Sequence, residues 1–391
     1  MKRVIIIGAS YAGLYAIKEL SKNKNIEILL FDKKDYHYIQ VESYGFVATK
    51  YSISDVTISI SKYIEDINSN IKFHKEEIVS FDASNNEVFS SNNTKYKYDD
   101  LIIATGSLTN FPPQVPNIQK YSKGIKTLQK ASIVNQSFDS IINSVVLKEK
   151  SSKNLPYNIV IGGAGLSGVE VAAEMAALVK ERFSLINNDT SNINIYIVDG
   201  MKTVLPNMDE RLIHACEKRL ENLNIKTYLG AFINDVDENT IYLNNGVKID
   251  YECFVFTGGI KGVTIDSNKT YEVNKLNQYI VNDHLQLKGE KNIFVIGDAA
   301  EVIANKKYMA PTAQLAIQAG TYVAKFIKNE MSYKYNEVFS PKSNGVLISL
   351  GGSYAIGLVF NKLFIKGYMA HVLKHFVTYM HKSKFKKLKA S

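Results

Sequence analysis

Apolar strands alternate with helical periodicity along this chain, and the alternation predicts two copies of one folding unit. In the first copy, the apolar strand Val4 to Ile7 leads into the loop 8-GASYAG-13, a helical pattern follows, and the strand 26-IEILLFD-32 ends in an acid. In the second copy, 158-NIVIGGAGLSG-168 supplies strand and loop, and 193-INIYIVD-199 again ends in an acid. This order predicts an α/β fold with two Rossmann-like dinucleotide-binding domains.

The first glycine loop has the residues that a dinucleotide pyrophosphate requires. Gly8 makes the tight turn, and Gly13 lets the helix pack closely against the strand, while the helix N-terminus offers N–H groups and a positive dipole to phosphate. Asp32 stands where a carboxylate accepts hydrogen bonds from ribose hydroxyls. Ser10 occupies the middle position, which is usually glycine. Because strand, loop, helix, strand and acid occur in order, an ordinary glycine turn is the weaker interpretation.

The second glycine loop carries all three glycines of the pattern, Gly163, Gly165 and Gly168. We expect Asp199 to favour NADH, because a carboxylate pairs with a free 2′-hydroxyl and repels a 2′-phosphate. No arginine follows Asp199 closely, although Lys202 stands a few residues further on. The spacing between loop and acid is long, and the segment 180-KERFSLINNDTSN-192 accounts for it as an extension of the helix or the loop.

Two more strand ends carry signals of a bound flavin nucleotide. The apolar strand that starts at Asp99 ends in a backbone-rich turn containing Thr105 and Gly106. A later apolar strand ends in Gly297 and Asp298, and an aspartate at that place can hold ribityl hydroxyls while the next helix points its N-terminus at the isoalloxazine. Each turn is common alone, but their order around two nucleotide loops is specific.

Composition fits a soluble α/β enzyme of two or three domains. The 391 residues include 46% hydrophobic residues and 23 glycines, which excludes a disordered or fibrous chain. The opening apolar run is too short for a secretory signal, and no apolar run is long enough for a membrane-spanning helix. The cysteines Cys216 and Cys253 form no CxxC or metal-ligand pattern, so we expect no metal and interpret both as buried reduced thiols in a cytosolic protein.

The positive charge of the chain is concentrated at its C-terminus. The net charge is +9, and residues 338–391 contain nine lysines and no Asp, Glu or Arg, so the rest of the chain is formally neutral. This distribution argues against nucleic-acid binding by the body and for an anionic partner at the tail.

The tail has the pattern of an amphipathic helix within 362-KLFIKGYMAHVLKHFVTYMHKSKFKKLK-389. Apolar residues at three- and four-residue steps predict one stripe: Ile365, Tyr368, Met369, Val372, Leu373, Phe376 and Met380. Basic residues fall on the other side: Lys366, Lys374, His381 and Lys382, followed by the cluster 382-KSKFKKLK-389. The pattern is typical of a helix in a membrane interface, so we expect residues 362–391 to bind an anionic membrane surface. The alternative is a helix packed on the body or on a second subunit in a homodimer.

These motifs together resemble the two-dinucleotide-fold flavoprotein oxidoreductases, and within them the type II NADH dehydrogenases (NADH:quinone oxidoreductases). The resemblance covers nearly the whole chain. It rests on these stretches: 8-GASYAG-13, 32-DKKDYHYIQ-40, 104-ATGS-107, 163-GAGLSGVEVAAE-174, 253-CFVFTGGIKG-262, 279-YIVNDHLQL-287, 297-GDAA-300 and 312-TAQLAIQ-318.

The resemblance implies that the first loop holds non-covalent FAD and that the second loop binds NADH. It adds four residues to the cofactor contacts: Lys33, Gly258, Gly259 and Ala313. The implied domains are a discontinuous FAD-binding domain (1–125 and 265–340), an NADH-binding domain (154–262) and a C-terminal membrane-associating region (341–391).

The helix in 310-APTAQLAIQAG-320 carries Gln314 and Gln318, and a spacing of four places them on one face. By the resemblance this face lines a quinone pocket against the flavin, where amides donate hydrogen bonds to quinone carbonyls without burying a charge. The alternative is a pair of solvent or capping glutamines. The resemblance also places Glu170 at the nicotinamide side, although a first-turn carboxylate favoured by the helix dipole explains it equally. We interpret Glu174, one turn on, as structural.

The resemblance therefore implies a peripheral enzyme on the cytoplasmic face of the cell inner membrane. Such an enzyme passes electrons from NADH through FAD to a quinone in respiratory electron transport, and it does not pump protons. Two alternatives stay open: a sulfide:quinone oxidoreductase-like enzyme, which needs cysteines near the flavin, and a flavoprotein redox partner or sensor with a protein acceptor. The segment 36-YHYIQVESYGFVA-48 departs from the Pro-Leu-Leu-Tyr run usual in the family, at Val41 and Glu42 above all, so the identity of the quinone stays open.

Overall fold

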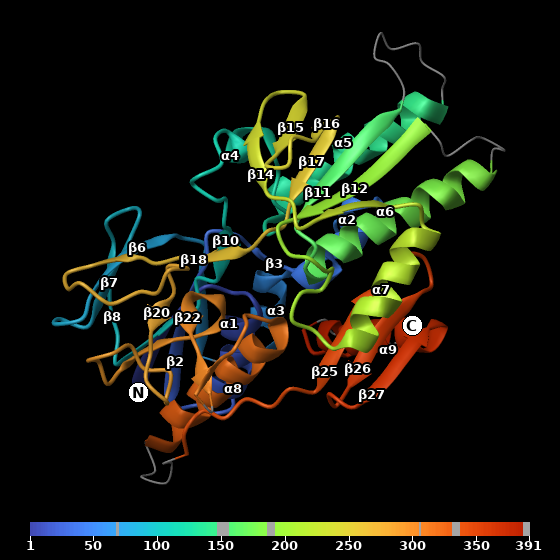
Figure 1. Cartoon of the computed structure of the whole chain (residues 1–391). Helices are drawn as coiled ribbons and strands as arrows, with labels where there is room; N and C mark the ends of the chain where they lie inside the picture. Colours follow the sequence, from blue (N-terminus) through green and yellow to red (C-terminus); the bar gives the residue numbers. More distant parts are fainter. Residues whose placement is uncertain (68–69, 147–155, 186–191, 305, 331–336, 386–391) are drawn as a thin grey trace.

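A five-stranded parallel sheet forms the first half of the molecule (Figure 1). The computed structural model describes residues 1–67, 70–146, 156–185, 192–304, 306–330 and 337–385. The strand order is β21–β9–β1–β2–β5, with bounds β1 Lys2–Ile7, β2 Ile26–Phe31, β5 Ile71–His74, β9 Asp100–Ile103 and β21 Ile293–Val295. The central strands are apolar and buried on both faces, as is usual in parallel sheets. The edge strand β21 comes from a part of the chain far from the other four strands.

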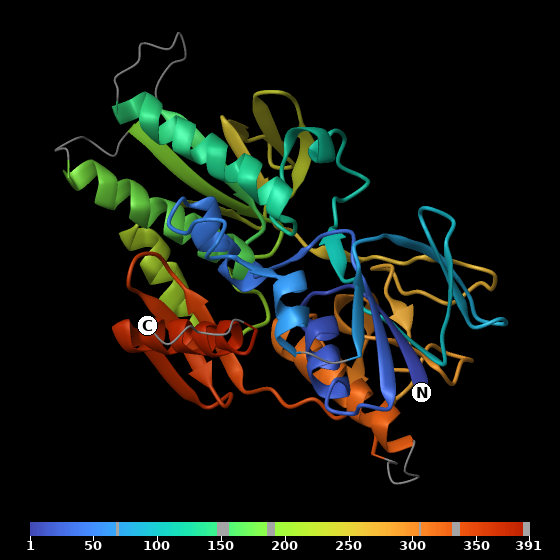
Figure 2. The same ribbon diagram turned by 180° about the vertical axis from the view of Figure 1, so that it is seen from behind.

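Helices α1 (Tyr11–Leu20) and α8 (Ala313–Glu330) pack against each other beside this sheet (Figure 2). Gly320 allows the close approach, because a Cβ at that position would lie 2.1 Å from the carbonyl oxygen of Ala12. This contact brings the N-terminal glycine loop and the start of α8 to one end of the sheet.

A four-stranded parallel sheet forms the second half, with the order β13–β12–β11–β17. The bounds are β11 Tyr157–Gly162, β12 Ile193–Asp199, β13 Lys226–Leu229 and β17 Cys253–Phe256, with helices α5 Leu128–Val146, α6 Leu166–Leu185 and α7 Glu210–Asn222. The strand before each glycine loop lies between the acid-bearing strand and one further strand, in both sheets. The prediction of two Rossmann-like units is thus confirmed, and both units have the same arrangement of strands around the glycine loop. The extension predicted at 180–192 begins as the last turn of α6, and residues 186–191 lie outside the described part of the chain.

Smaller elements connect the two halves. A mixed sheet flanks the first half, with the strands β6 Ile78–Asp82, β7 Glu87–Ser90, β8 Lys95–Lys97 and β19 Asp266–Ser267, of which β19 pairs with β6 in parallel. An antiparallel sheet flanks the second half, with the strands β14 Ile233–Val236, β15 Thr240–Leu243 and β16 Lys248–Asp250. The strands β10 (Ser107–Thr109) and β18 (Ile260–Gly262) pair where the chain crosses between the halves. The remaining elements are short: β3 Tyr36–Tyr38, η1 Gln40–Glu42, α2 Ser43–Val47, β4 Thr57–Ser59, α3 Ile60–Ile67, α4 Ile118–Tyr121, β20 Tyr279–Ile280, η3 Gly297–Ala299, β22 Ala300–Glu301, β23 Ile303–Ala304 and β24 Lys307–Tyr308.

The C-terminal region is a three-stranded antiparallel sheet followed by one helix. Its elements are β25 Gly345–Ser349, β26 Ala355–Val359, β27 Leu363–Gly367 and α9 Tyr368–Ser383. The helix predicted from the tail pattern therefore begins later than expected, because Ile365 and Lys366 lie on β27. The end of the predicted basic cluster, residues 386–389, lies outside the described residues. Among the described helices, none has the length and apolarity needed to cross a bilayer.

Candidate functional site

The first glycine loop makes the close backbone contacts that its glycines predict. Gly8 has φ +105°, and a Cβ on it would lie 2.3 Å from the carbonyl oxygen of Ala104. A Cβ on Gly13 would lie 1.9 Å from the carbonyl oxygen of Gly8. Neither position accommodates a side chain, so α1 starts directly above the end of β1 and leaves its first N–H groups facing the loop.

The second loop repeats this construction. Gly163 has φ +114°, and a Cβ on it would lie 2.7 Å from Thr257 Oγ1; a Cβ on Gly168 would lie 1.8 Å from the carbonyl oxygen of Gly163. A Cβ on Gly165 would meet no atom within 4 Å. Glycine at this middle position is therefore not required by the protein's own packing, and the space beside it suits the close approach of a phosphate.

Each loop holds the acid of the following strand by a backbone hydrogen bond. The Ala9 N–H donates to Asp32 Oδ2 (2.9 Å), and the Ala164 N–H donates to Asp199 Oδ2 (2.6 Å). The second carboxylate also accepts a bond from the Met201 N–H through Oδ1 (2.7 Å). Both carboxylates are therefore fixed beside their loops, at the place where a ribose diol would need an acceptor.

Asp298 lies in a polar cluster between the two halves of the molecule. Ser107 Oγ (2.6 Å) and Lys126 Nζ (2.9 Å) both donate to its Oδ2. Lys126 arrives from the second half, because Lys123 on the same segment forms a parallel bridge with Val255 beside β17. The predicted ribityl partner is thus held between the two sheets, and Lys126 is a site residue that no sequence motif singled out.

The crossing strands place the remaining turn residues near this cluster. Thr105 Oγ1 donates to the carbonyl oxygen of Val263 (2.5 Å), and the Val263 N–H donates to the carbonyl oxygen of Gly106 (3.0 Å). Gly297, with φ +72°, lies against Ala12 and Ala316, so η3 fits between α1 and α8.

Four cofactor residues predicted from the resemblance have unequal surroundings. Gly258 and Gly259 follow β17, and a Cβ on Gly258 would lie 2.5 Å from the ring of Phe256. Ala313 is the first residue of α8. Lys33 forms an exposed ion pair with Glu77 (2.8 Å).

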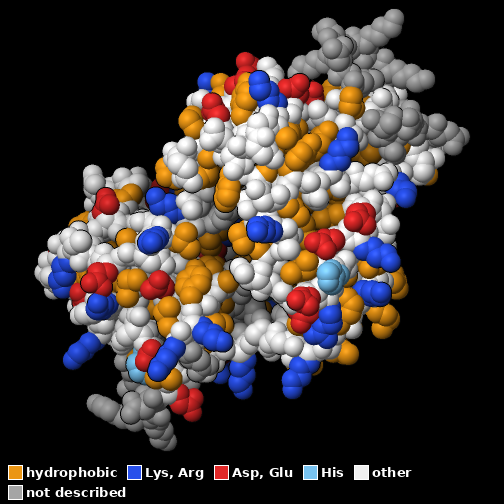
Figure 3. All heavy atoms as spheres, in the orientation of Figure 1, with side chains coloured by type: hydrophobic (Ala, Val, Ile, Leu, Met, Phe, Trp, Pro, Cys, Tyr) orange, Lys and Arg blue, Asp and Glu red, His pale blue; other side chains and the backbone are white. Residues whose placement is uncertain are grey.

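The space-filling view shows a hollow between the two halves with hydrophobic side chains along its rim (Figure 3).

The two glutamines of α8 differ in their contacts. Gln318 Nε2 donates to the carbonyl oxygen of Lys342 (2.9 Å), and Gln318 Oε1 accepts from the Lys342 N–H (2.9 Å). This reciprocal pair ties α8 to the chain that leads into β25. The half-buried Gln314 makes no such side-chain bond within the described part of the chain. Of the two amides, Gln314 is therefore the one available to a ligand.

Glu170 lies where α6 meets the C-terminal region. Its Oε1 accepts a hydrogen bond from the Ser349 N–H (2.9 Å) and an ion-paired bond from Lys374 Nζ on α9. The same ammonium lies 4.8 Å from the ring centroid of buried Tyr44. Glu174, one turn further along α6, pairs with Lys50 (2.7 Å) and is almost completely buried. Sequence patterns gave no sign that a tail lysine would reach the second glycine helix.

Helix α9 turns its polar side inward and its apolar side outward. Ala370, Lys374, Thr378 and His381 are buried against the body. The exposed side carries Tyr368, Met369, Val372, Phe376, Val377, Tyr379 and Met380. Of the residues predicted for the basic side, Lys374 and His381 are buried and Lys382 is partly buried, whereas Lys366 lies on β27 and is exposed. Lys374 pairs with Glu170 and Lys382 pairs with Glu42, so body carboxylates neutralise two tail lysines.

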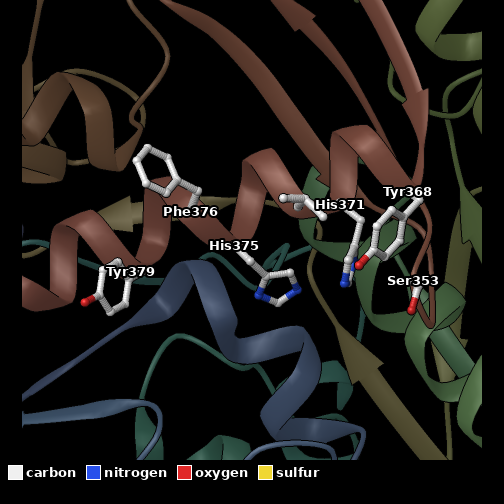
Figure 4. A pocket seen from close by; sticks show the side chains of 7 residues that line it. Ser353, Tyr368, His371, His375, Phe376 and Tyr379 are labelled. Atoms are coloured by element: carbon white, nitrogen blue, oxygen red, sulfur yellow. The ribbon is translucent and has the colours of Figure 1, made fainter. Parts of the chain in front are cut away.

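A groove of about 470 Å³ runs along the aromatic side of α9. Figure 4 shows His371 and His375 pointing to the same side of the helix, while Phe376 points away from them. The ring centroids of the two histidines lie 4.3 Å apart, and that of His375 lies 6.5 Å from the ring centroid of Tyr51. Desolvation lowers the pKa of His375 to about 4, so this ring is neutral near pH 7.

A buried histidine pair links α9 to the first glycine loop. Ser10 Oγ lies 3.3 Å from His37 Nδ1, and His37 Nε2 lies 3.4 Å from His381 Nε2. Tyr15 Oη lies 3.3 Å from the other nitrogen of His381. Burial lowers the pKa of His37 to about 3 and that of His381 to about 4, so both rings are neutral near pH 7. The serine at the middle loop position thus has a structural partner.

Both cysteines are buried and free, Cys216 on α7 and Cys253 on β17. Burial raises the pKa of each thiol to about 12, so the nucleophilic thiolate is scarce at neutral pH. Their interpretation as buried thiols is confirmed, and neither has the properties of a redox-active cysteine.

A family model described as pyridine nucleotide-disulphide oxidoreductase matches residues 2–320. The chain belongs to this family. Within the pyridine nucleotide-disulphide oxidoreductases it is similar to type II NADH:quinone oxidoreductases of Staphylococcus aureus, for example those of strains MSSA476 and NCTC 8325. Each is 27% identical over 376 residues, which cover 92% of this chain and 90% of the relative. The resemblance drawn from the motifs is confirmed.

Two solved structures share the whole fold. NDH2 from Plasmodium falciparum in complex with NADH aligns with a TM-score of 0.86 and 19% identity, over 97% of this chain and 94% of that one. The sulfide:quinone oxidoreductase from Aquifex aeolicus aligns with a TM-score of 0.83 and 18% identity, over 98% and 91%. Both branches share one architecture, so the choice between them depends on side chains.

Proposed function

We propose that this protein is a peripheral membrane NADH:quinone oxidoreductase with non-covalent FAD that does not pump protons. The observation that carries the proposal is the pair of glycine loops, because each loop holds the acid of its unit by a backbone N–H. Asp298, bonded by Lys126, lies between the two units. Two dinucleotides on facing units and no reactive thiol among the described residues suit hydride chemistry at a flavin better than thiol chemistry.

The residues of the first unit fit a flavin dinucleotide. Gly8 and Gly13 leave the loop backbone free for a pyrophosphate, Asp32 offers an acceptor to the adenosine ribose, and Asp298 offers one to the ribityl chain. When bound, FAD would accept a hydride equivalent from NADH and yield two electrons to a quinone. The protein's part is to orient both partners and to supply charge and protons.

At the acceptor end, Gln314 has suitable chemistry. A neutral amide donates to a quinone carbonyl without leaving an unpaired charge. Glu170, which the resemblance assigns to the nicotinamide side, pairs with Lys374 at the junction of α6 and α9, where Lys374 Nζ also lies against the Tyr44 ring. Gln318, already bonded to Lys342, positions α8 in this proposal.

The outward apolar side of α9 supports membrane attachment. Helix α9 packs on the body through its buried side, which leaves the Met, Val, Phe and Tyr side chains of the other side exposed and uncovered by the described part of the chain. A bilayer interface or a second subunit covers such a face, and the exposed Lys366 and Lys384 at its ends suit anionic headgroups on the cytoplasmic face of the inner membrane.

The Asp298 cluster provides a direct test of the flavin assignment. We expect Asp298→Ala to yield largely flavin-free protein, because the ribityl acceptor is lost and Lys126 remains as an unpaired cation. Asp266→Ala, a change of a more exposed aspartate in the same half, should keep its flavin. Absorbance between 350 and 500 nm per mole of protein measures the difference, on the order of a severalfold loss. Full flavin retention in Asp298→Ala would show that Asp298 does not hold the cofactor.

Donor specificity separates this proposal from the sulfide branch. Anaerobic addition of NADH should bleach the flavin within the mixing time of a spectrophotometer, and sulfide should leave it oxidised. The opposite result would reassign the protein to sulfide oxidation, in spite of its two buried cysteines.

A further inference from the structure

One large aromatic side chain stands exposed beside the second nucleotide site. Phe232, just before β14, is 62% exposed to solvent. Isolated apolar side chains on a protein surface are common and need no explanation. This one differs because its backbone is held by hydrogen bonds and because a glycine lies directly beneath the ring.

The glycine is Gly200, the residue that follows Asp199. A Cβ built on Gly200 would lie only 2.1 Å from the Phe232 ring. The ring therefore lies flat enough against the Gly200 backbone to exclude any side chain there. Because Gly200 directly follows Asp199, the Phe232 ring that lies on Gly200 is close to Asp199.

The backbone of Phe232 is held on both sides. Its N–H donates to Asn244 Oδ1 (3.0 Å), and its carbonyl oxygen accepts from the Asn244 N–H (2.9 Å). The preceding Ala231 N–H donates to the carbonyl oxygen of Asp199 (3.1 Å). A Phe side chain has few torsions to restrict when a ligand binds to it, so an exposed ring on a hydrogen-bonded backbone is a good platform.

The first nucleotide unit is built differently at this place. There the residue after the acid is Lys33, and it pairs with Glu77 from the segment after β5 (2.8 Å). In the second unit the residue after the acid is Gly200, and an aromatic ring from the segment after β13 covers it. The aromatic ring is thus a feature of the second site and not of the fold in general.

From these contacts we infer that Phe232 is the stacking platform for the adenine of NADH. In a dinucleotide the base is attached to C1′ of the ribose, next to the 2′-hydroxyl that Asp199 would accept. The base must therefore land within a ring's width of Asp199, where Phe232 offers an apolar π-face. Stacking of a base on an aromatic ring is worth about fivefold to more than a hundredfold in affinity. This inference rests on the proposed NADH site.

The test uses holoenzyme, in which flavin already fills the first site, and two probes that divide the dinucleotide. ADP-ribose contains the adenine and its ribose and no nicotinamide, and its binding is measured by calorimetry without turnover. Reduced nicotinamide mononucleotide lacks the adenine, and its use is measured as the rate of flavin reduction. Phe232→Ala should weaken ADP-ribose at least fivefold and leave the rate with the mononucleotide unchanged.

Two further variants keep the result interpretable. Phe232→Tyr retains the ring and should bind ADP-ribose like the wild type, even if the Ala variant proves poorly folded. Leu185→Ala removes an exposed apolar side chain at the far end of α6 and should change neither probe.

Unchanged ADP-ribose affinity in folded Phe232→Ala, or equal loss for both probes, would overturn the platform while leaving NADH oxidation intact. Wild-type holoenzyme that ignores both ADP-ribose and NADH would instead overturn the proposed function, and the platform with it.

Discussion

At the residue scale, the two nucleotide sites depend on carboxylates whose positions are set by backbone N–H groups. Asp32 and Asp199 each accept a bond from the residue after the first loop glycine. A ribose hydroxyl then meets an acceptor that is already oriented, so little ordering remains to be done on binding. Sequence spacing predicted both acids, because the βαβ pattern fixes where the second strand must end.

The choice between NADH and NADPH follows from Asp199. We expect Asp199→Ala to weaken NADH by roughly tenfold to over a hundredfold, since a lost bond to a charged group costs about 1.5–3 kcal/mol. NADPH should lose less, because the repulsion of its 2′-phosphate disappears as well. Steady-state KM values for both nucleotides measure this, with Asp235→Asn in β14 as a charge-loss control. Equal NADH and NADPH parameters before and after the change would show that Asp199 is remote from the ribose.

The two glutamines of α8 should separate cleanly. Gln314→Ala should slow quinone reduction and leave the reduction of the flavin by NADH nearly intact in stopped-flow half-reactions. Gln318→Ala breaks the two bonds to Lys342 and should mainly lower Tm, with a cost of about 1–3 kcal/mol for the polar groups left unpaired. Equal damage to both half-reactions in Gln314→Ala would assign that residue to packing.

The buried histidines predict how stability depends on pH. The folded pKa of His381, about 4, is below its unfolded value, so the unfolded state takes up the proton first. The stabilisation that neutral His381 gives the folded state is complete above about pH 6.5 and is lost as the pH falls toward 4. At pH 5 the free energy of unfolding has fallen by about 2 kcal/mol from this cause. The fall in Tm from pH 7 to pH 5 should therefore be smaller in His381→Gln than in the wild type. An identical fall in both proteins would mean that this imidazole is not buried neutral.

At the element scale, α9 is the part that sequence patterning predicted least completely. Periodicity predicted an apolar and a basic side, but it placed Ile365 and Lys366 on the helix and cannot tell which side meets the body. The lysine excess suggested a headgroup-facing surface, whereas Lys374 and Lys382 find carboxylates on α6 and η1. Those partners lie some 200 or more positions away in the sequence, so no local pattern reveals them.

Point changes on the outer side of α9 test membrane attachment better than a truncation. Removing residues 362–391 would also remove β27 and the Lys374 partner of Glu170. The triple change Val372→Ser, Phe376→Ser, Met380→Ser alters exposed positions only, and it should release the protein from anionic liposomes in a flotation assay while keeping its flavin. High salt alone should release the wild type only partly, because screening leaves apolar burial intact. Wild-type protein that never floats with liposomes would refute the attachment.

At the scale of the whole molecule, the sequence predicted the two Rossmann-like units and missed the contacts that join them. Glycine loops, strand ends and acids are local signals with fixed spacing. Lys126 on Asp298, His381 on His37 and Phe232 on Gly200 are contacts between distant segments. Glu42 shows the connection best: it departs from the usual family pattern, and its partner is a lysine of the tail. The residue that departs from the family motif therefore forms an ion pair with the tail.

The most direct test of the account is an anaerobic double-mixing experiment on the purified holoenzyme. NADH first reduces the flavin, and a soluble quinone, a ferredoxin or buffer is then added while flavin absorbance is recorded. We predict rapid reoxidation by the quinone, at a rate high enough to support steady-state turnover, and none by ferredoxin or buffer on that time scale. A flavin that NADH reduces but quinone fails to reoxidise would contradict the central claim and indicate a protein acceptor instead.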